Sequence, residues 1–171
     1  VLGECESTNS VMMNAASQDD GRVLVVVAER QTAGRGRRGR SWLAWPGASL
    51  TFSVLWRFPD GASVPAGLSL VAGLALAVAL EKLGVAGVRL KWPNDVLIEG
   101  RKLAGILVEL QSGRGRAPAA VIGIGLNMAL PAAAEIPGQP GVCSLADCLT
   151  EVPDRSQVLA GILVELQDLL G

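Results

Sequence analysis

The sequence predicts an α+β fold, with one mixed, largely antiparallel β-sheet and flanking helices placed on one side of it. Several β-branched or alternating segments follow one another without regularly spaced helices, which argues against a doubly wound parallel sheet. One long Ala/Leu-rich segment has the length of a helix. Half of the residues are apolar and 18% are charged, so the 171-residue chain can bury the core of a single domain.

The first third of the chain predicts one helix and two strands. Ser7, Thr8 and Asn9 are typical N-cap residues, so a short helix is expected to begin there. The run from Arg22 to Glu29 is continuous and β-branched, which predicts a strand buried on both faces. Residues Ser49 to Trp56 alternate, which predicts a half-buried strand.

The uncharged segment from Gly61 to Leu80 has the length of a membrane span. It contains Pro65, two serines and three glycines, and Ala and Val supply most of its remaining bulk. A buried core helix from about Pro65 to Leu83, stopped by Gly84, fits this composition better, so we expect no membrane association.

The rest of the chain predicts more strands and a closing helix. A hairpin is expected where two strands flank the turn Glu99–Arg101. The expected elements are strands at 88–91, 96–98, 103–109 and 119–125, a loop at 131–141 and a helix at 154–170.

One nonapeptide, LAGILVELQ, occurs twice, at 103–111 and at 159–167. Intrinsic propensity alone would give both copies the same structure. The first copy is flanked by a turn and by Gly113, whereas the second lies within a longer helical pattern that begins at Asp154. We therefore expect the first copy to be a strand and the second a helix, without a repeat architecture.

The composition excludes some classes of function. The chain has no histidine, so it cannot by itself supply a histidine base, metal ligand or pH switch. Cys5, Cys143 and Cys148 lack the spacing of a metal site, and their odd number favours reduced thiols. The chain does not open with the basic region of a secretory signal, so a cytoplasmic location is expected.

The strongest local motif is GRGRRGR at residues 34–40, preceded by Arg30 and followed by Trp42. Glycines let backbone amides approach an anion, and arginines bind carboxylate or phosphate. We expect this loop to repel itself when empty and to be mobile until an anion arrives, with Trp42 able to stack on a purine.

Other interpretations of this loop are single-stranded nucleic acid binding, which requires aromatic platforms and a wider basic surface, and a merely solvated basic loop. The spacing does not match a P-loop.

Three further motifs are weaker when taken singly. In KWPND, residues 91–95, Asp95 is a candidate Mg²⁺ ligand, although an ordinary turn is the better explanation of the motif taken alone. Lys102, before an apolar strand, could neutralise a substrate carboxylate or face solvent as a turn residue. The glycines of GIGLN, residues 123–127, allow close approach of a ligand or of another backbone, and Asn127 offers both donor and acceptor.

Taken together, these motifs resemble those of bacterial biotin protein ligases. The resemblance is carried by Ser7-Thr8-Asn9, QTAGRGRRGRSW at 31–42, KWPNDVLIEGRKLAGILVE at 91–109 and GIGLNM at 123–128, all in the family's order. It covers roughly residues 1–130 and implies a central mixed sheet like that of class II aminoacyl-tRNA synthetases.

The activity that the resemblance implies is that of an ATP-dependent biotin–protein ligase. Biotin and MgATP would form biotinyl-5′-AMP and pyrophosphate, and a lysine of a biotin carrier domain would then take the biotinyl group. The implied partner is that domain of acetyl-CoA carboxylase or a related carboxylase, and the implied cofactors are ATP, biotin as substrate, and Mg²⁺. A homodimer through an exposed sheet edge stays open.

Roles for individual residues also follow from the resemblance. Biotin contacts are implied for Ser7, Thr8, Asn9, Gln31, Gly34, Arg35, Gly36, Arg37, Lys102 and Gly105. ATP contacts are implied for Arg37, Arg40, Trp42, Asn94, Asp95 and Asn127. Lys102 would hold the biotin carboxylate, and Lys102 and Arg37 would act as catalytic residues by offsetting the repulsion between carboxylate and triphosphate. Asp95 or solvent would take the proton of the acceptor lysine.

Two alternatives remain, and the domain content differs from the family's usual one. A lipoate or octanoate protein ligase shares the fold and the acyl-adenylate chemistry, although its glycine-rich motif differs. A nucleic-acid-binding module using the arginine loop belongs to another class. We interpret residues 1–171 as the catalytic domain alone, without the family's C-terminal barrel-like domain or the N-terminal helix-turn-helix of some members, so no DNA binding is expected.

Overall fold

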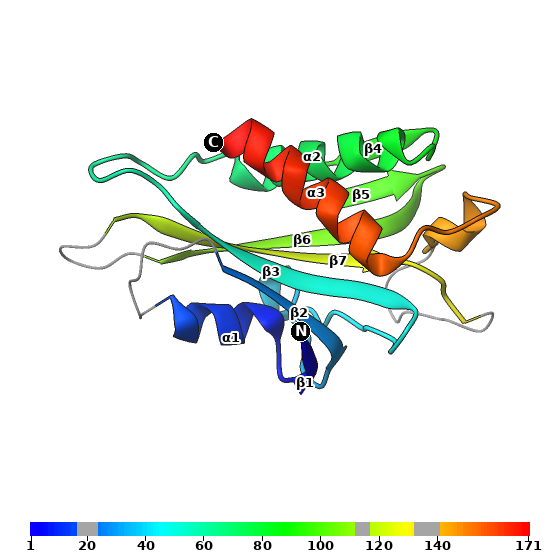
Figure 1. The fold of residues 1–171 in the computed structure, drawn as a ribbon, viewed down its shortest axis with the longest axis horizontal. Coiled ribbons are helices and arrows are strands. Elements are labelled where there is room, and N and C mark those ends of the chain that lie inside the picture. Colours follow the sequence, from blue (N-terminus) through cyan, green and yellow to red (C-terminus); the bar gives the residue numbers. More distant parts are fainter. Residues whose placement is uncertain (17–23, 112–116, 132–140) are drawn as a thin grey trace.

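The structure is a computed structural model that describes residues 1–16, 24–111, 117–131 and 141–171. A seven-stranded mixed sheet crosses the molecule, with helices on both faces (Figure 1). The sheet order is β1-β2-β3-β7-β6-β5-β4, and all neighbouring pairs are antiparallel except β1 with β2. The strands are β1 Leu2–Cys5, β2 Leu24–Gln31, β3 Ser49–Arg57, β4 Val88–Lys91, β5 Asp95–Ile98, β6 Arg101–Gln111 and β7 Ala119–Asn127.

The three described α-helices divide between the two faces, so the expectation of helices on one side is wrong. Helices α2 (Leu68–Lys82) and α3 (Arg155–Leu170) lie together over one face, and α1 (Thr8–Ala15) covers the other (Figure 1). The physical reason is that alternate side chains of β3 enter two separate cores. Phe52 packs in the core with α2 and α3, whereas Leu55 packs with Met12 of α1.

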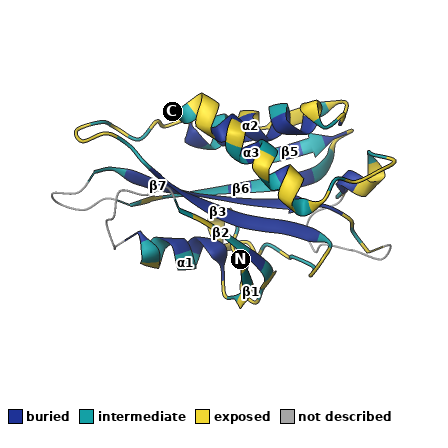
Figure 2. Cartoon of the chain, in the orientation of Figure 1, coloured by how far each residue is buried: buried dark blue, intermediate teal, exposed yellow. Residues whose placement is uncertain are grey.

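Burial reverses the expectations for two strands, as Figure 2 shows. Strand β2, expected to be buried on both faces, is only partly covered because it lies one strand from the sheet edge. Strand β3, expected to be half-buried, is buried at every residue except Arg57. Its polar side chains are tolerated because they are hydrogen-bonded; Thr51 Oγ1, for example, donates to the Ala28 carbonyl oxygen at 3.0 Å.

The other elements follow the sequence closely. The hairpin β5–β6, the strand β7, the core helix and the closing helix are all present near the expected bounds. The nonapeptide forms part of β6 in its first copy and part of α3 in its second, as context predicts. Strand β1 was not predicted; it is a four-residue edge strand whose pairing with β2 is long-range.

Two of the expected elements lie partly or largely outside the described residues. The loop expected at 131–141 lies largely outside the described residues, as do Arg22 and Val23 of the predicted strand at 22–29. Within the described part of the chain, no helix combines the length and the apolar character needed to cross a membrane.

Candidate active site

A cavity of about 320 Å³ opens on the α1 face of the sheet, within the range typical of small-molecule sites. It lies between the start of α1, the loop after β2, the β4–β5 turn and the strands β6 and β7. Most of the predicted site residues line it: Ser7, Thr8, Asn9, Gln31, Arg35, Gly36, Arg37, Arg40, Trp42, Asn94, Asp95, Lys102 and Gly105. The structure therefore brings together motifs from four separate segments of the chain.

Strand register explains why there is space at this place. One row across the sheet pairs Asp95 with Gly105, Gly105 with Gly125, and Gly125 with Thr51. The next such row places Leu107 beside Gly123 and Gly123 beside Ser53. Glycine, serine and threonine project little or nothing from a sheet, so the face stays open there. Farther along the same strands, Leu55 and Val121 fill the space under α1.

The end of the cavity beside α1, which we call the polar end, is lined by Ser7, Thr8, Asn9 and Gln31, and Ser53 is hydrogen-bonded to two of them. Ser7 occupies the N-cap position but its side chain makes no capping hydrogen bond. The Thr8 amide and hydroxyl donate to Gln31 Oε1 at 2.7 and 3.1 Å. The Ser53 hydroxyl lies 2.8 Å from Thr8 Oγ1 and 2.6 Å from Asn9 Oδ1. These buried groups hold one another in fixed orientations and suit an uncharged polar ligand.

Two side chains that line the cavity lie so close to the sheet that glycines are required beneath them. A Cβ on Gly123 would lie 2.0 Å from Asn9 Oδ1, so only glycine lets Asn9 reach the sheet. A Cβ on Gly125 would lie 2.2 Å from Trp42 Cε2, and one on Gly105 would lie 3.2 Å from Trp42 Cζ3. The indole of Trp42 therefore lies across this glycine pair. Its Nε1 is buried and has no hydrogen-bond partner among the described residues, which leaves a donor for a ligand.

Lys102 lines the cavity next to Trp42 and to Asp95 at the start of β5. Its Nζ is 2.8 Å from Asp95 Oδ1 and 5.6 Å from the centre of the Trp42 ring. Both members of this ion pair are largely buried, with 18% and 25% of their side chains exposed. Asn94 fixes the turn against β6, because its Nδ2 donates to the Ile106 carbonyl oxygen at 3.0 Å.

The segment from Gly34 to Trp42, which we call the arginine loop, forms one wall. Gly34 and Trp42 pair at its base, where the Trp42 amide donates to the Gly34 carbonyl oxygen at 2.8 Å. Arg37, Arg38 and Arg40 are exposed and make no ion pair with any residue that the structure describes. With Asp95 as the one described acidic residue lining the cavity, the site attracts anions strongly.

Two predicted site residues do not line this cavity. Gly34 lies at the base of the arginine loop, where a Cβ would be 2.4 Å from the Trp42 carbonyl oxygen, and it lines a neighbouring cavity instead. Asn127 is buried, and its Nδ2 donates to the Cys143 carbonyl oxygen at 3.0 Å and to the Lys102 carbonyl oxygen at 3.4 Å. Asn127 thus holds the backbone of Lys102, while its Oδ1 is buried without a partner in the described residues.

The cysteines do not form a metal centre. No cluster of three or more potential metal-ligating side chains occurs within the described residues, and the three cysteines are free thiols. Burial raises the pKa of Cys143 to about 11, with the neighbouring Cys148 adding to the effect. Cys143 therefore stays a neutral thiol at physiological pH, and its amide donates to the Lys102 carbonyl oxygen at 2.9 Å.

Several lining residues were not among the predicted site residues. Some had a signal: Lys91, Trp92 and Pro93 belong to the KWPND motif, and Gly123 and Gly125 to the GIGLN motif. Arg38 and Ser41 belong to the QTAGRGRRGRSW motif, Ile106 and Leu107 to the KWPNDVLIEGRKLAGILVE motif, and Ile124 to the GIGLN motif. Thr51 carried no signal that could be read from spacing, because only cross-strand register brings it to the cavity.

Fold and site together define a class: an α+β domain whose cavity joins a neutral polar end to a strongly cationic wall. Residues 4–127 match the biotin/lipoate A/B protein ligase family. The chain belongs to this family.

Known relatives agree with this assignment. The bifunctional ligase/repressor BirA of Escherichia coli is 42% identical over 98% of this chain, and the biotin–[acetyl-CoA-carboxylase] ligase of Mycobacterium tuberculosis is 41% identical over the same share. These matches cover 51% and 62% of the relatives, so the chain spans about half to three fifths of their length.

Solved structures have the same fold. The biotin protein ligase from Aquifex aeolicus in complex with biotin and ATP is 33% identical, with a TM-score of 0.79, covering 98% of this chain and 67% of that one. The ligase from Leishmania major in complex with biotinyl-5-AMP is 25% identical, with a TM-score of 0.81 and coverage of 98% and 72%.

Proposed function

We propose that this chain is the catalytic domain of a biotin protein ligase. It would activate biotin with ATP to biotinyl-5′-AMP and pass biotin to a lysine of a carboxylase carrier domain. The observation that carries the proposal is the single cavity lined by Lys102, by a hydrogen-bonded polar end and by the arginine loop. The relatives named for biotin ligation and the neighbour bound to biotinyl-5-AMP support the choice of substrate.

The polar end suits the head group of biotin, which is a neutral urea ring with one acceptor oxygen and two N–H donors. Hydroxyl, amide and carbonyl groups of Ser7, Thr8, Asn9 and Gln31 offer both donors and acceptors there. The acyl chain of biotin would lie toward Gly105, and its carboxylate would reach Lys102. Lys102 would then exchange its bond to Asp95 for a bond to substrate.

In the first step, a carboxylate oxygen of biotin attacks the α-phosphorus of ATP. A C(O)–O–P bond forms, and the bond between the α-phosphorus and the bridging oxygen breaks, releasing pyrophosphate. Two anions repel each other in water, so the reaction requires positive charge that is already in place. Lys102 would hold the carboxylate, Arg37 and Arg40 would bind the phosphates, and Trp42 would cover the adenine side.

The donor set of the cavity fits Mg²⁺ bound mainly through the nucleotide. Mg²⁺ prefers one or two carboxylates together with substrate phosphates and water. Asp95 is the described carboxylate in the cavity, and no described cluster would form an all-protein cage. Asp95 would hold the ion, which would neutralise charge on the phosphates.

In the second step, the amine of the acceptor lysine attacks the acyl carbon of biotinyl-5′-AMP. An amide bond forms, AMP leaves with the electron pair of the C–O bond, and the proton passes to Asp95 or to solvent. The carrier domain of acetyl-CoA carboxylase or a related carboxylase would be the acceptor. A homodimer and a cytoplasmic location belong to the same proposal.

Calorimetry with biotin and with lipoate tests the proposal, followed by a pyrophosphate-release assay with MgATP. We expect tight binding of biotin, no binding of lipoate, and pyrophosphate release that depends on biotin. Binding of lipoate alone would indicate the lipoate ligase of the same fold. Salt-dependent oligonucleotide binding that requires Arg37 and Arg38, without biotin binding, would indicate a nucleic-acid module.

A further inference from the structure

Glu109 lies under the arginine loop, outside the main cavity. It is part of β6, and 27% of its side chain is exposed. A second cavity adjoins the main one there, and Glu109 lines it together with residues 33–41 and Leu107. No role in substrate contact was predicted for this residue, and it does not line the main cavity.

One oxygen of Glu109 accepts hydrogen bonds from two parts of the active site. Arg35 of the arginine loop donates from Nη2 to Glu109 Oε2 at 2.5 Å. Asn9 at the polar end donates from Nδ2 to the same oxygen at 2.8 Å. Both donors belong to residues that line the main cavity. Glu109 therefore joins the polar end to the arginine loop through a single carboxylate.

The two residues that donate to Glu109 differ in how firmly they are held. Asn9 is buried and is held on its other side by Ser53, 2.6 Å from Asn9 Oδ1, so its Nδ2 has a defined direction. Arg35 is more exposed, with 44% of its side chain accessible, and it belongs to a loop whose other arginines have no described carboxylate partner. The charge of Glu109 lowers the repulsion within this loop and gives one of its arginines a fixed anchor.

We propose that Glu109 is a positioning residue that couples the arginine loop to the polar end of the cavity. A ligand that binds Asn9 in its observed orientation also stabilises the bond from Asn9 to the carboxylate, and the carboxylate held there favours the observed position of Arg35. By linkage, Arg35 in this position favours the ligand to the same extent. The inference deepens the proposed function and rests on it for the identity of the ligand, which is biotin.

Glu109→Gln tests the coupling with little risk to the fold, because the amide oxygen can still accept a hydrogen bond while the charge is lost. Replacing a charge-assisted bond with a neutral one should raise the KM for biotin about tenfold and change kcat about twofold at most. Without ligands, trypsin should cleave the loop after Arg37, Arg38 and Arg40 about fivefold faster in this variant, as mass spectrometry would show.

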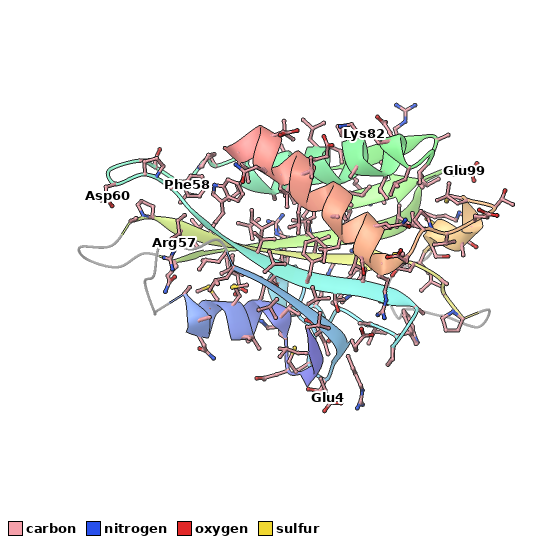
Figure 3. The ribbon with its side chains drawn as sticks, in the orientation of Figure 1. Glu4, Arg57, Phe58, Asp60, Lys82 and Glu99 are labelled. Atoms are coloured by element: carbon pink, nitrogen blue, oxygen red, sulfur yellow. The ribbon has the colours of Figure 1, made fainter. Side chains whose placement is uncertain are left out.

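Glu4→Gln is the matched control. Glu4 of β1 also pairs with an arginine, Arg30, at 2.5 Å, but both side chains are more than half exposed and neither lines the cavity (Figure 3). This variant should keep the wild-type KM and the wild-type cleavage rate. In addition, Arg35→Ala with Glu109→Gln should be cleaved no faster than Arg35→Ala alone, because the two residues act through one contact.

A higher KM for biotin together with faster loop cleavage supports the coupling. A change in only one of the two readouts, or in neither, overturns it, as does an equal effect of Glu4→Gln. If the wild-type protein binds no biotin, the proposed function fails, and the cleavage comparison still decides whether Glu109 anchors the loop.

Discussion

The polar end and the arginine loop line the same cavity but differ in how their side chains are held. At the polar end, Thr8, Asn9 and Ser53 are buried and satisfied by one another. In the arginine loop, Arg37, Arg38 and Arg40 are exposed and lack described ion-pair partners. Fixed neutral groups select a ligand by shape and hydrogen bonding, whereas exposed cations attract any anion and take their final positions from it. Selectivity should therefore lie at the polar end and charge neutralisation in the loop.

Lys102→Ala should have the largest effect, because it removes the largely buried cation that lines the cavity. We expect pyrophosphate release to fall by about 100- to 1,000-fold, with weaker biotin binding as well. A rate near wild type would contradict the role of Lys102. Lys82→Ala is the control, since Lys82, labelled in Figure 3, pairs with Glu165 at 2.5 Å between α2 and α3, and neither residue lines the cavity.

Gly123→Ala tests whether the polar end carries selectivity. The added Cβ would lie 2.0 Å from Asn9 Oδ1, so Asn9 must leave its position. The KM for biotin should rise by about tenfold or more, the cost of a displaced buried polar group, while the KM for ATP changes little. Gly3→Ala is the control, because nothing lies within 4 Å of a Cβ at Gly3. If the KM values for biotin and for ATP rise equally, the polar end does not carry the selectivity.

Limited proteolysis compares the loop with and without substrates. Biotin and ATP together should slow tryptic cleavage after Arg37, Arg38 and Arg40 by about tenfold, because bound anions pair with these side chains. Cleavage after Arg155, which pairs with Glu29 at 2.5 Å outside the cavity, serves as the internal control. If cleavage proceeds equally in both states, the loop does not depend on the ligand.

The smallest effect is expected at Cys143, whose amide donates to the Lys102 carbonyl oxygen. Its pKa is raised from 9.0 to about 11 in the folded protein, so the folded state keeps its proton where the unfolded state has lost it. The free energy of unfolding should therefore fall as pH rises from about 9 to about 11, and change no further from this group above that. Urea unfolding at several pH values should show a smaller fall for Cys143→Ala.

Much of the site could be predicted because its chemistry is concentrated in contiguous motifs. Cations and glycines in GRGRRGR, and the lysine after the β5–β6 turn, reveal an anion site from residue type alone. Glu109 could not be found in this way, because an acidic residue on a strand predicts no particular role until its spatial neighbours are known. The contact of Asn127 could not be found for the same reason: its amide holds the backbone of Lys102.

The sequence by itself determined the α+β class, most of the elements, the resemblance to biotin ligases and the cationic character of the loop. These follow from local composition and periodicity, which act over a few residues. The tertiary structure alone decided that α1 lies opposite α2 and α3, that β3 is buried on both faces, and that Gly105, Gly125 and Thr51 share one row. Strand order and register depend on pairing between distant segments, and it is this pairing that leaves the sheet bare where the ligand would bind.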